Sequence, residues 1–333
     1  MFRFIKSISL ASQILVPVIA LILFIPVPFL THESRFAVPP NGMHNEIGLL
    51  INQLPGWASA LIAFLLTLFG AVRLNDGDLK HLLMSRRSYA ISFVFIFLTA
   101  SSGQAFYFHQ AFLAGIAILV GNKYMLDLYK SETTFPLIFS LAFSWGLAGL
   151  IYPPVFFILP ATIVGMVLMG SNTLRHFLVF LAGLVTPAGM LLAVWFLTGN
   201  LGYELNSLTY WFSFRLNPLP GFIRDNWLIS AWLALIFIWI VIASAGYRNP
   251  RVQSRRLFQA NFLQFILTLA VALLVVPVGP EIIWLLLIPV TYLFTFWVLE
   301  VEKGWKRDLF FISLLISWLV FLLNDTFFIV GRL

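Results

Sequence analysis

The stretch GLAGLIYPPVFFIL, residues 146–159, decides how this chain folds, because it places two adjacent prolines inside a long uncharged segment. No lysine, arginine, aspartate or glutamate occurs between Glu132 and Arg175. One helix over 133–174 would be about 60 Å long, roughly twice the thickness of a bilayer core. The second proline also disfavours the α conformation at the first. The stretch therefore predicts two membrane helices joined by a tight hairpin at Tyr152-Pro153-Pro154.

The composition is that of an integral membrane protein. Of the 333 residues, 61% are hydrophobic and 10% are charged, whereas about 25% of the residues in a soluble domain are charged. The mean hydropathy is +0.96. We predict an all-α, polytopic transmembrane bundle that forms a single domain over 1–333. It has about 11 spans, near 11–30, 57–72, 88–101, 106–122, 134–151, 154–170, 177–198, 227–246, 258–277, 282–299 and 309–324.

The distribution of lysine and arginine predicts the orientation. If the N-terminus is cytoplasmic and the spans alternate, sixteen of the 20 lysines and arginines lie inside. The four on the outer side are Arg35, Arg215, Arg224 and Arg332. Cytoplasmic loops carry such an excess of basic residues, which also accounts for the net charge of +7 without a nucleic-acid partner. The chain is therefore predicted to lie in the inner (cytoplasmic) membrane with its C-terminus outside.

The polar residues that could carry chemistry are concentrated in the predicted outer loops, 31–56 and 199–226. Both loops mix aromatic and charged residues, which is typical of segments lying in the membrane interface. Carboxylates and histidines can act as acids or bases, and arginines bind phosphates. The candidate catalytic residues are Glu33, Glu46 and His109, and the candidate substrate-binding residues are His32, Arg35, Arg215 and Arg224. The alternative interpretation is a solvated loop with surface charges.

Other kinds of site are not indicated. The chain has no cysteine, and the spacing of His32, Glu33 and His44 matches no metal-ligand pattern, so we predict neither a metal site nor a cofactor. The spans carry no ionisable residue at mid-depth, where such residues usually mark proton or ion pathways. This argues against a proton-coupled transporter and against a channel for charged ions, and it leaves transport of an uncharged or lipidic substrate open.

Two parts of the chain resemble a known but uncharacterised family. They are HNEIGLLINQLPGWASALIAFLLTLFGAVRLND (44–76) and AFYFHQAFLAGIAILVGNKYMLDLYKSETTFPLIFSLAFSWGLAGLIYPPVFFILP (105–160). Both are similar to multi-pass membrane proteins of Bacteroidetes that carry a domain of unknown function. The resemblance covers about two thirds of the chain and implies a polytopic fold without a known activity.

A broader resemblance is to C-type-fold glycosyltransferases that use polyprenyl-phosphate sugars. It is carried by the order of the spans, the first outer loop and the helix pair around GLAGLIYP (146–153). The catalytic carboxylate of that family lies early in the first outer loop. The resemblance therefore implies that Glu33, or else Glu46, deprotonates an acceptor while Arg215 or Arg224 holds the donor phosphate.

The sequence leaves three functions open. The first is a non-catalytic scaffold or assembly component of a cell-envelope system, which agrees with the scarcity of polar residues in the spans. The second is a lipid-linked glycosyltransferase acting at the outer face. The third is a transporter of an uncharged or lipidic substrate. The predicted partners are membrane lipids and, for the second function, a polyprenyl-phosphate-linked substrate.

Overall fold

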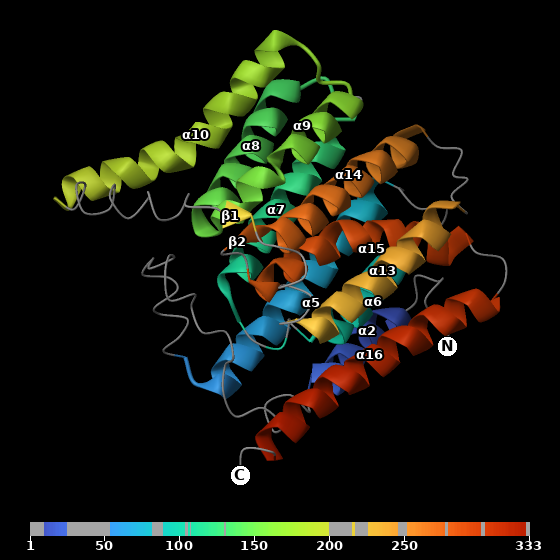
Figure 1. Cartoon of the computed structure of the whole chain (residues 1–333). Helices are drawn as coiled ribbons and strands as arrows, with labels where there is room; N and C mark the ends of the chain where they lie inside the picture. The colour runs from blue at the N-terminus through green and yellow to red at the C-terminus, as the bar shows by residue number, and fades with distance from the viewer. Residues whose placement is uncertain are drawn as a thin grey trace.

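The computed structural model describes residues 10–24, 54–81, 89–103, 106, 108–129, 131–199, 215–216, 226–245, 252–276, 279–300 and 304–330. In these residues the chain forms eleven α-helices, which pack as one bundle, and a strand pair of two residues each (Figure 1). The elements are α2 (Leu10–Phe24), α5 (Gly56–His81), α6 (Ala90–Ser101), α7 (Gln110–Asp127), α8 (Thr134–Ile151), η1 (Pro153–Phe157), α9 (Leu159–Leu168), α10 (Leu174–Leu197), β1 (Arg215–Leu216), α13 (Trp227–Ala245), α14 (Val252–Leu274), β2 (Val275–Val276), η2 (Pro280–Ile282), α15 (Ile283–Glu300) and α16 (Gly304–Val330). The predicted helical class is confirmed, and each of these α-helices falls on one predicted span.

Five of the described helices are long and apolar enough to cross a membrane. They are Gly56–Asp76, Thr134–Ile151, Leu174–Leu197, Trp227–Ala245 and Val252–Leu274. Shorter apolar helices occur at Leu15–Phe24, Ala90–Ser101, Leu159–Leu168 and Ile283–Leu299. The membrane character of the chain thus rests on helix length and composition, and the figure of 11 spans stays a prediction.

The two prolines at the corner end one helix and start the next, as predicted. Helix α8 ends at Ile151, Tyr152 has a non-helical conformation, and η1 begins at Pro153. A proline in the first turn loses no hydrogen bond, because that N–H has no partner within the helix. A Cβ at Gly149 would overlap the ring of Phe156, so η1 folds back closely against the last turn of α8. A single helix over 133–174 is therefore excluded.

A tight hairpin implies that α9, the helix after the corner, packs against α8, but its main partner is α14. Helix α9 packs chiefly against α14, whereas α8 packs chiefly against α7 and α10. At Gly165 of α9, a Cβ would lie 2.7 Å from Met125 Sδ and 3.4 Å from Ala260 Cβ. This close approach joins α9 to α7 and α14. The prolines set the turn, whereas Gly165 in the returning helix lets that helix lie close to Met125 and Ala260.

Helices α6 and α15 form the centre of the bundle. All twelve residues of α6 are buried, and so is α15 from Ile283 to Val298. Both helices contact each other, and α15 also contacts α7, α13 and α14. The buried hydroxyls of Thr99, Thr291 and Thr295 each donate to the carbonyl four residues earlier. A helix can therefore carry these polar side chains through an apolar interior without leaving a donor unsatisfied.

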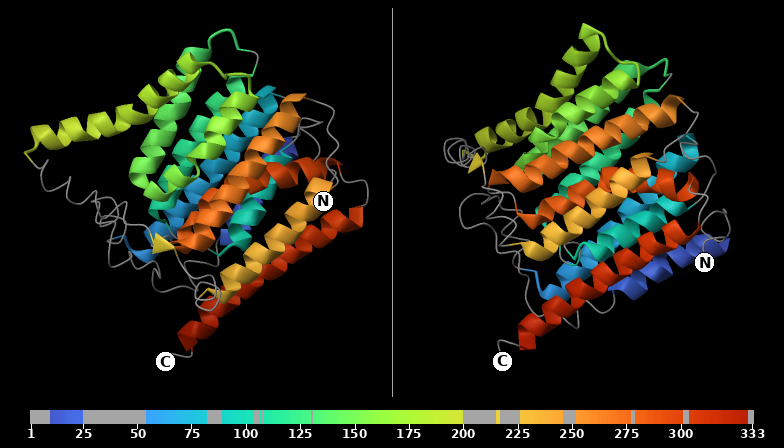
Figure 2. Two further views of the ribbon diagram at one scale, coloured as in Figure 1. Left: turned by 45° about the horizontal axis from the view of Figure 1, so that its top comes forward. Right: turned by 45° about the vertical axis from the view of Figure 1, so that its right-hand side comes forward.

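Helix α10 lies at the edge of the bundle and leaves it halfway along. Its first half approaches α8 closely, since a Cβ at Gly183 would lie 2.6 Å from the Phe139 carbonyl oxygen. A Cβ at Gly146 of α8 would likewise overlap the Leu184 carbonyl. Beyond Pro187, which lies inside the helix, the second half points away from α8 (Figures 1 and 2). Proline is a common cause of such a kink.

Candidate functional site

Two ends of the bundle hold the charged and polar side chains that could take part in a site. Helices α7 and α8 run between these ends, and each has 18 residues, or about 27 Å. The end that holds the α8–η1 corner and η2 is named here the Glu281 end. The end that holds the start of α8 and the start of α14 is named the Arg256 end. In the predicted topology, the Glu281 end is the outer one.

The central feature of the Glu281 end is a buried tie between two distant parts of the chain. The Tyr152 hydroxyl donates a hydrogen bond of 3.0 Å to Glu281 Oε1. The Gly279 N–H donates a second bond of 3.0 Å to the same oxygen. The carboxylate lies directly against Gly279, where a Cβ would collide with it. Tyr152 at the proline corner is thereby joined to the turn before α15, 129 residues later.

The surroundings of this tie alter the proton affinity of both groups. Burial raises the pKa of the Glu281 carboxyl above its ordinary value, although hydrogen bonds from the backbone and from Tyr152 partly lower it. Burial, followed by the Glu281 charge, raises the pKa of Tyr152 well above its usual value. The Tyr152 hydroxyl therefore stays protonated and acts as a donor, while Glu281 can hold a proton nearer to neutral pH than a solvated carboxylate can.

The structure places Arg215 at the Glu281 end through its backbone. Strand β1 pairs with β2 in antiparallel register, with Arg215 opposite Val276 and Leu216 opposite Val275. Val276 precedes Gly279 by three residues, so β1 lies beside the chain that leads into η2. Arg215 and Leu216 therefore lie at the same end as the turn that carries Glu281, although they are far from it in the sequence.

His109 also lies at this end, as the residue before α7. Its backbone is extended, and its side chain is only 6% exposed. The imidazole ring lies 4.6 Å from the ring of Phe112, which itself lies 4.7 Å from Trp284 at the start of α15. His109 is thus buried within an aromatic cluster that extends towards η2.

Two of the predicted site residues, His109 and Arg215, lie in the described part of the chain, and both occur at the Glu281 end. Their catalytic and binding roles stay predictions. The candidates His32, Glu33, Arg35, Glu46 and Arg224 lie outside the described residues. Within the described part of the chain, no three His, Asp or Glu side chains gather closely enough to hold a metal ion.

Sequence reasoning missed the two residues that form the tie. A signal for Glu281 was present, since it is the only charged residue between Arg256 and Glu300. An isolated carboxylate in so long an apolar region needs a partner or a neutralised charge. Tyr152 offered no comparable signal, because its partner is 129 residues away and only the fold brings the two together.

Comparison with known proteins adds no relative to these observations. The chain matches no protein-family model, no curated protein and no solved structure.

Proposed function

We propose that the protein is a non-catalytic scaffold or assembly component of a cell-envelope system in the inner membrane. The observation that carries the proposal is helix α10, which offers a docking surface for a transmembrane helix of a partner protein. The described polar groups of the Glu281 end support this role, since the tie between Tyr152 and Glu281 holds two corners of the bundle in fixed positions.

Helix α10 differs from the other long helices in its burial. Only 17% of its most apolar window is buried, compared with 39–44% in the other four helices that can cross a membrane. Its second half is the most exposed part, with Met190 at 60%, Phe196 at 71% and Leu197 at 82%. This half points away from α8 (Figure 2), and α8 is the main partner of α10 among the described elements.

The exposed side of α10 also has the residue spacing that helices use to approach each other in membranes. Gly189 and Ala193 are both exposed and lie four residues apart. No atom lies within 4 Å of the position of a Cβ at Gly189. Small residues at this spacing let two helix backbones come close, which is a main source of helix association in lipid. Gly183 already serves α8 in this way within the bundle.

A photo-crosslinking amino acid at Met190 tests the proposal in living cells. Irradiation is expected to yield a discrete adduct with one protein partner. The matched control is the same amino acid at Leu178, which is 58% exposed but lies in the half of α10 that stays beside α8. Equal protein adducts from both positions, or none from Met190, would contradict the scaffold proposal.

A second candidate function is a lipid-linked glycosyltransferase of the C-type fold, working at the outer face. The observation that favours it is Glu281, whose raised pKa suits a general base or acid. It lies at the end where Arg215 and His109 also lie. In this function Glu281 or a carboxylate of the first outer loop takes a proton from the acceptor.

The proposed orientation, with the N-terminus inside, has its own test. Because the chain lacks cysteine, single cysteines can be introduced at Glu132 and Thr198, which are both exposed and lie at opposite ends of the bundle. A membrane-impermeant thiol reagent added to intact cells with a permeabilised outer membrane is expected to label Thr198→Cys and not Glu132→Cys. Lysed cells provide the control in which both are labelled. The reverse labelling pattern would show the opposite orientation.

A further inference from the structure

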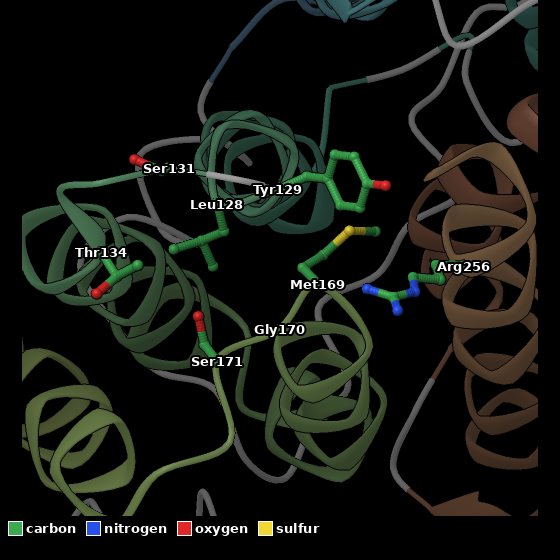
Figure 3. A pocket seen from close by; sticks show the side chains of 8 residues that line it. All are labelled: Leu128, Tyr129, Ser131, Thr134, Met169, Gly170, Ser171 and Arg256. Carbon is green, nitrogen blue, oxygen red and sulfur yellow. The ribbon is translucent and has the colours of Figure 1, made fainter. Parts of the chain in front are cut away.

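A pocket of about 370 Å³ opens at the Arg256 end, far from the tie between Tyr152 and Glu281 (Figure 3). This volume is at the lower end of the range of small-molecule sites, and it suits a headgroup-sized ligand. Three separate segments meet here: the end of α7 with the loop to α8, the turn after α9, and the start of α14. The lining residues are Leu128, Tyr129, Ser131, Thr134, Met169, Gly170, Ser171 and Arg256.

The pocket contains one positive charge that is held in place. Arg256, in the second turn of α14, directs its guanidinium group towards Met169 and the pocket (Figure 3). Its central carbon lies 5.9 Å from the centre of the Tyr129 ring, within the range of a cation–π contact. Within the described ranges, no carboxylate forms an ion pair with Arg256. An arginine in such a setting presents its planar set of N–H donors to an anion.

The turn after α9 supplies the opposite wall and depends on a glycine. Gly170 has a φ of 108°, which L side chains rarely adopt. Its N–H donates to Val167 and the Ser171 N–H donates to Met166, the pair of bonds that defines a Schellman motif. This motif ends the helix sharply and places the buried Ser171 side chain against the pocket (Figure 3).

The hydroxyls of Thr134 and Ser131 are used outside the pocket. Thr134 Oγ1 lies 3.2 Å from Nε2 of His176, at the start of α10, and Ser131 Oγ accepts from the Thr133 N–H. Both oxygens point away from Arg256, and Thr134 turns its methyl group towards the other lining residues (Figure 3).

The position of the pocket indicates the source of its ligand. Val167 and Leu174 flank the turn after α9, and Phe135 follows Thr134; all three side chains are exposed and apolar. Acyl chains can lie along such a surface while a headgroup enters the pocket. In the proposed topology this end faces the cytoplasmic leaflet, where basic pockets between helices bind anionic headgroups.

We propose that this pocket binds the phosphate of an anionic phospholipid, with Arg256 as the charged partner and the hydroxyl of Ser171 as a further donor. The shared chemistry is a phosphate anion, which a free phosphate compound also offers. The acyl chains would lie on the apolar surface formed by Phe135, Val167 and Leu174.

The experiment uses the purified full-length chain in a neutral detergent and native mass spectrometry with added phosphatidylglycerol. Arg256→Gln is expected to lower the apparent affinity about tenfold or more, because a hydrogen bond to a charged group is lost. Arg255→Gln is the matched control, since it removes the same charge from the exposed neighbour on the same helix.

A second measurement separates the two sources of phosphate. Thermal unfolding of the wild type and of both arginine variants is followed with phosphatidylglycerol, with phosphatidylcholine and with inorganic phosphate. A stabilisation by phosphatidylglycerol alone that Arg256→Gln abolishes supports the lipid site. A stabilisation by inorganic phosphate that depends on Arg256 overturns the lipid source and assigns the pocket to a soluble phosphate compound. Equal lipid binding by Arg255→Gln and Arg256→Gln, with both variants folded, overturns the proposal.

Discussion

Replacing Gly115 by alanine is expected to destabilise the folded bundle by about 3 kcal/mol or more, at the upper end of the cost of overpacking. Gly115 of α7 faces Trp284 of α15, and a Cβ there would overlap the indole ring. Trp284 is fully buried between Phe95, at 5.9 Å between ring centres, and Phe112, at 4.7 Å. A new Cβ would therefore have to displace a fully buried ring that is packed against two other aromatic rings.

A thermal unfolding series on purified protein measures this effect, and α10 offers a matched control. Gly189→Ala makes the same chemical change in a helix, but no atom lies within 4 Å of the new Cβ. Alanine in a helix interior is favoured over glycine by roughly 0.5–1 kcal/mol, so this variant is expected to be as stable as the wild type or slightly more stable. Similar unfolding temperatures for the two variants would show that α7 and α15 do not approach each other as closely as described.

The second large effect is expected at Glu281. Glu281→Ala removes the acceptor of two hydrogen bonds and leaves the Tyr152 hydroxyl and the Gly279 N–H without it. Each unsatisfied buried donor costs about 1–3 kcal/mol, so the loss is expected to be roughly 2–6 kcal/mol in total. Glu281→Gln keeps an oxygen at the same place and carries no charge, so the fold is expected to survive. The measurement is the abundance and the thermal stability of each variant in membranes.

The pH dependence of these variants follows from the raised pKa of Glu281. A carboxyl with a raised pKa in the folded state is favoured in its protonated form. Its contribution to stability is present below its unfolded pKa, about 4.3, and is lost as the pH rises through the folded pKa. The wild type is therefore expected to lose stability relative to Glu281→Gln as the pH increases from about 4 towards neutrality. A difference that is independent of pH would mean that the carboxylate is solvated.

The same pair of variants separates the two proposed functions. In a strain lacking the native gene, a scaffold with Glu281→Gln is expected to restore growth fully, because the tie is kept. A transferase that uses Glu281 as a base is expected to lose activity by about 10² or more while the protein stays at normal abundance. Glu132→Gln, at an exposed position of the other end, is the control for loss of a negative charge. Full growth with Glu281→Gln would remove Glu281 from any catalytic role.

Local chemistry in the sequence determined where the helices occur and where they end. The apolar windows, the two prolines after Tyr152 and the glycine at position 170 act over a few residues, and the chain folds accordingly there. These signals act whichever helix packs against the segment, because hydrophobic burial, a fixed proline φ and a positive φ at glycine are properties of short segments.

Only the tertiary structure decided which helices became neighbours and what the isolated polar residues do. Helix α9 packs chiefly against α14, where Gly165 admits both α7 and α14. The hydrogen-bond donor of Glu281 is 129 residues away, and Arg256 lines a pocket together with two other segments of the chain. The physical reason is that such contacts depend on how side chains fit together and on the cost of burying a charge. Both depend on residues that are far apart in the sequence. A pattern along one helix shows that a polar residue is present, whereas its partner is known only when the helices are packed.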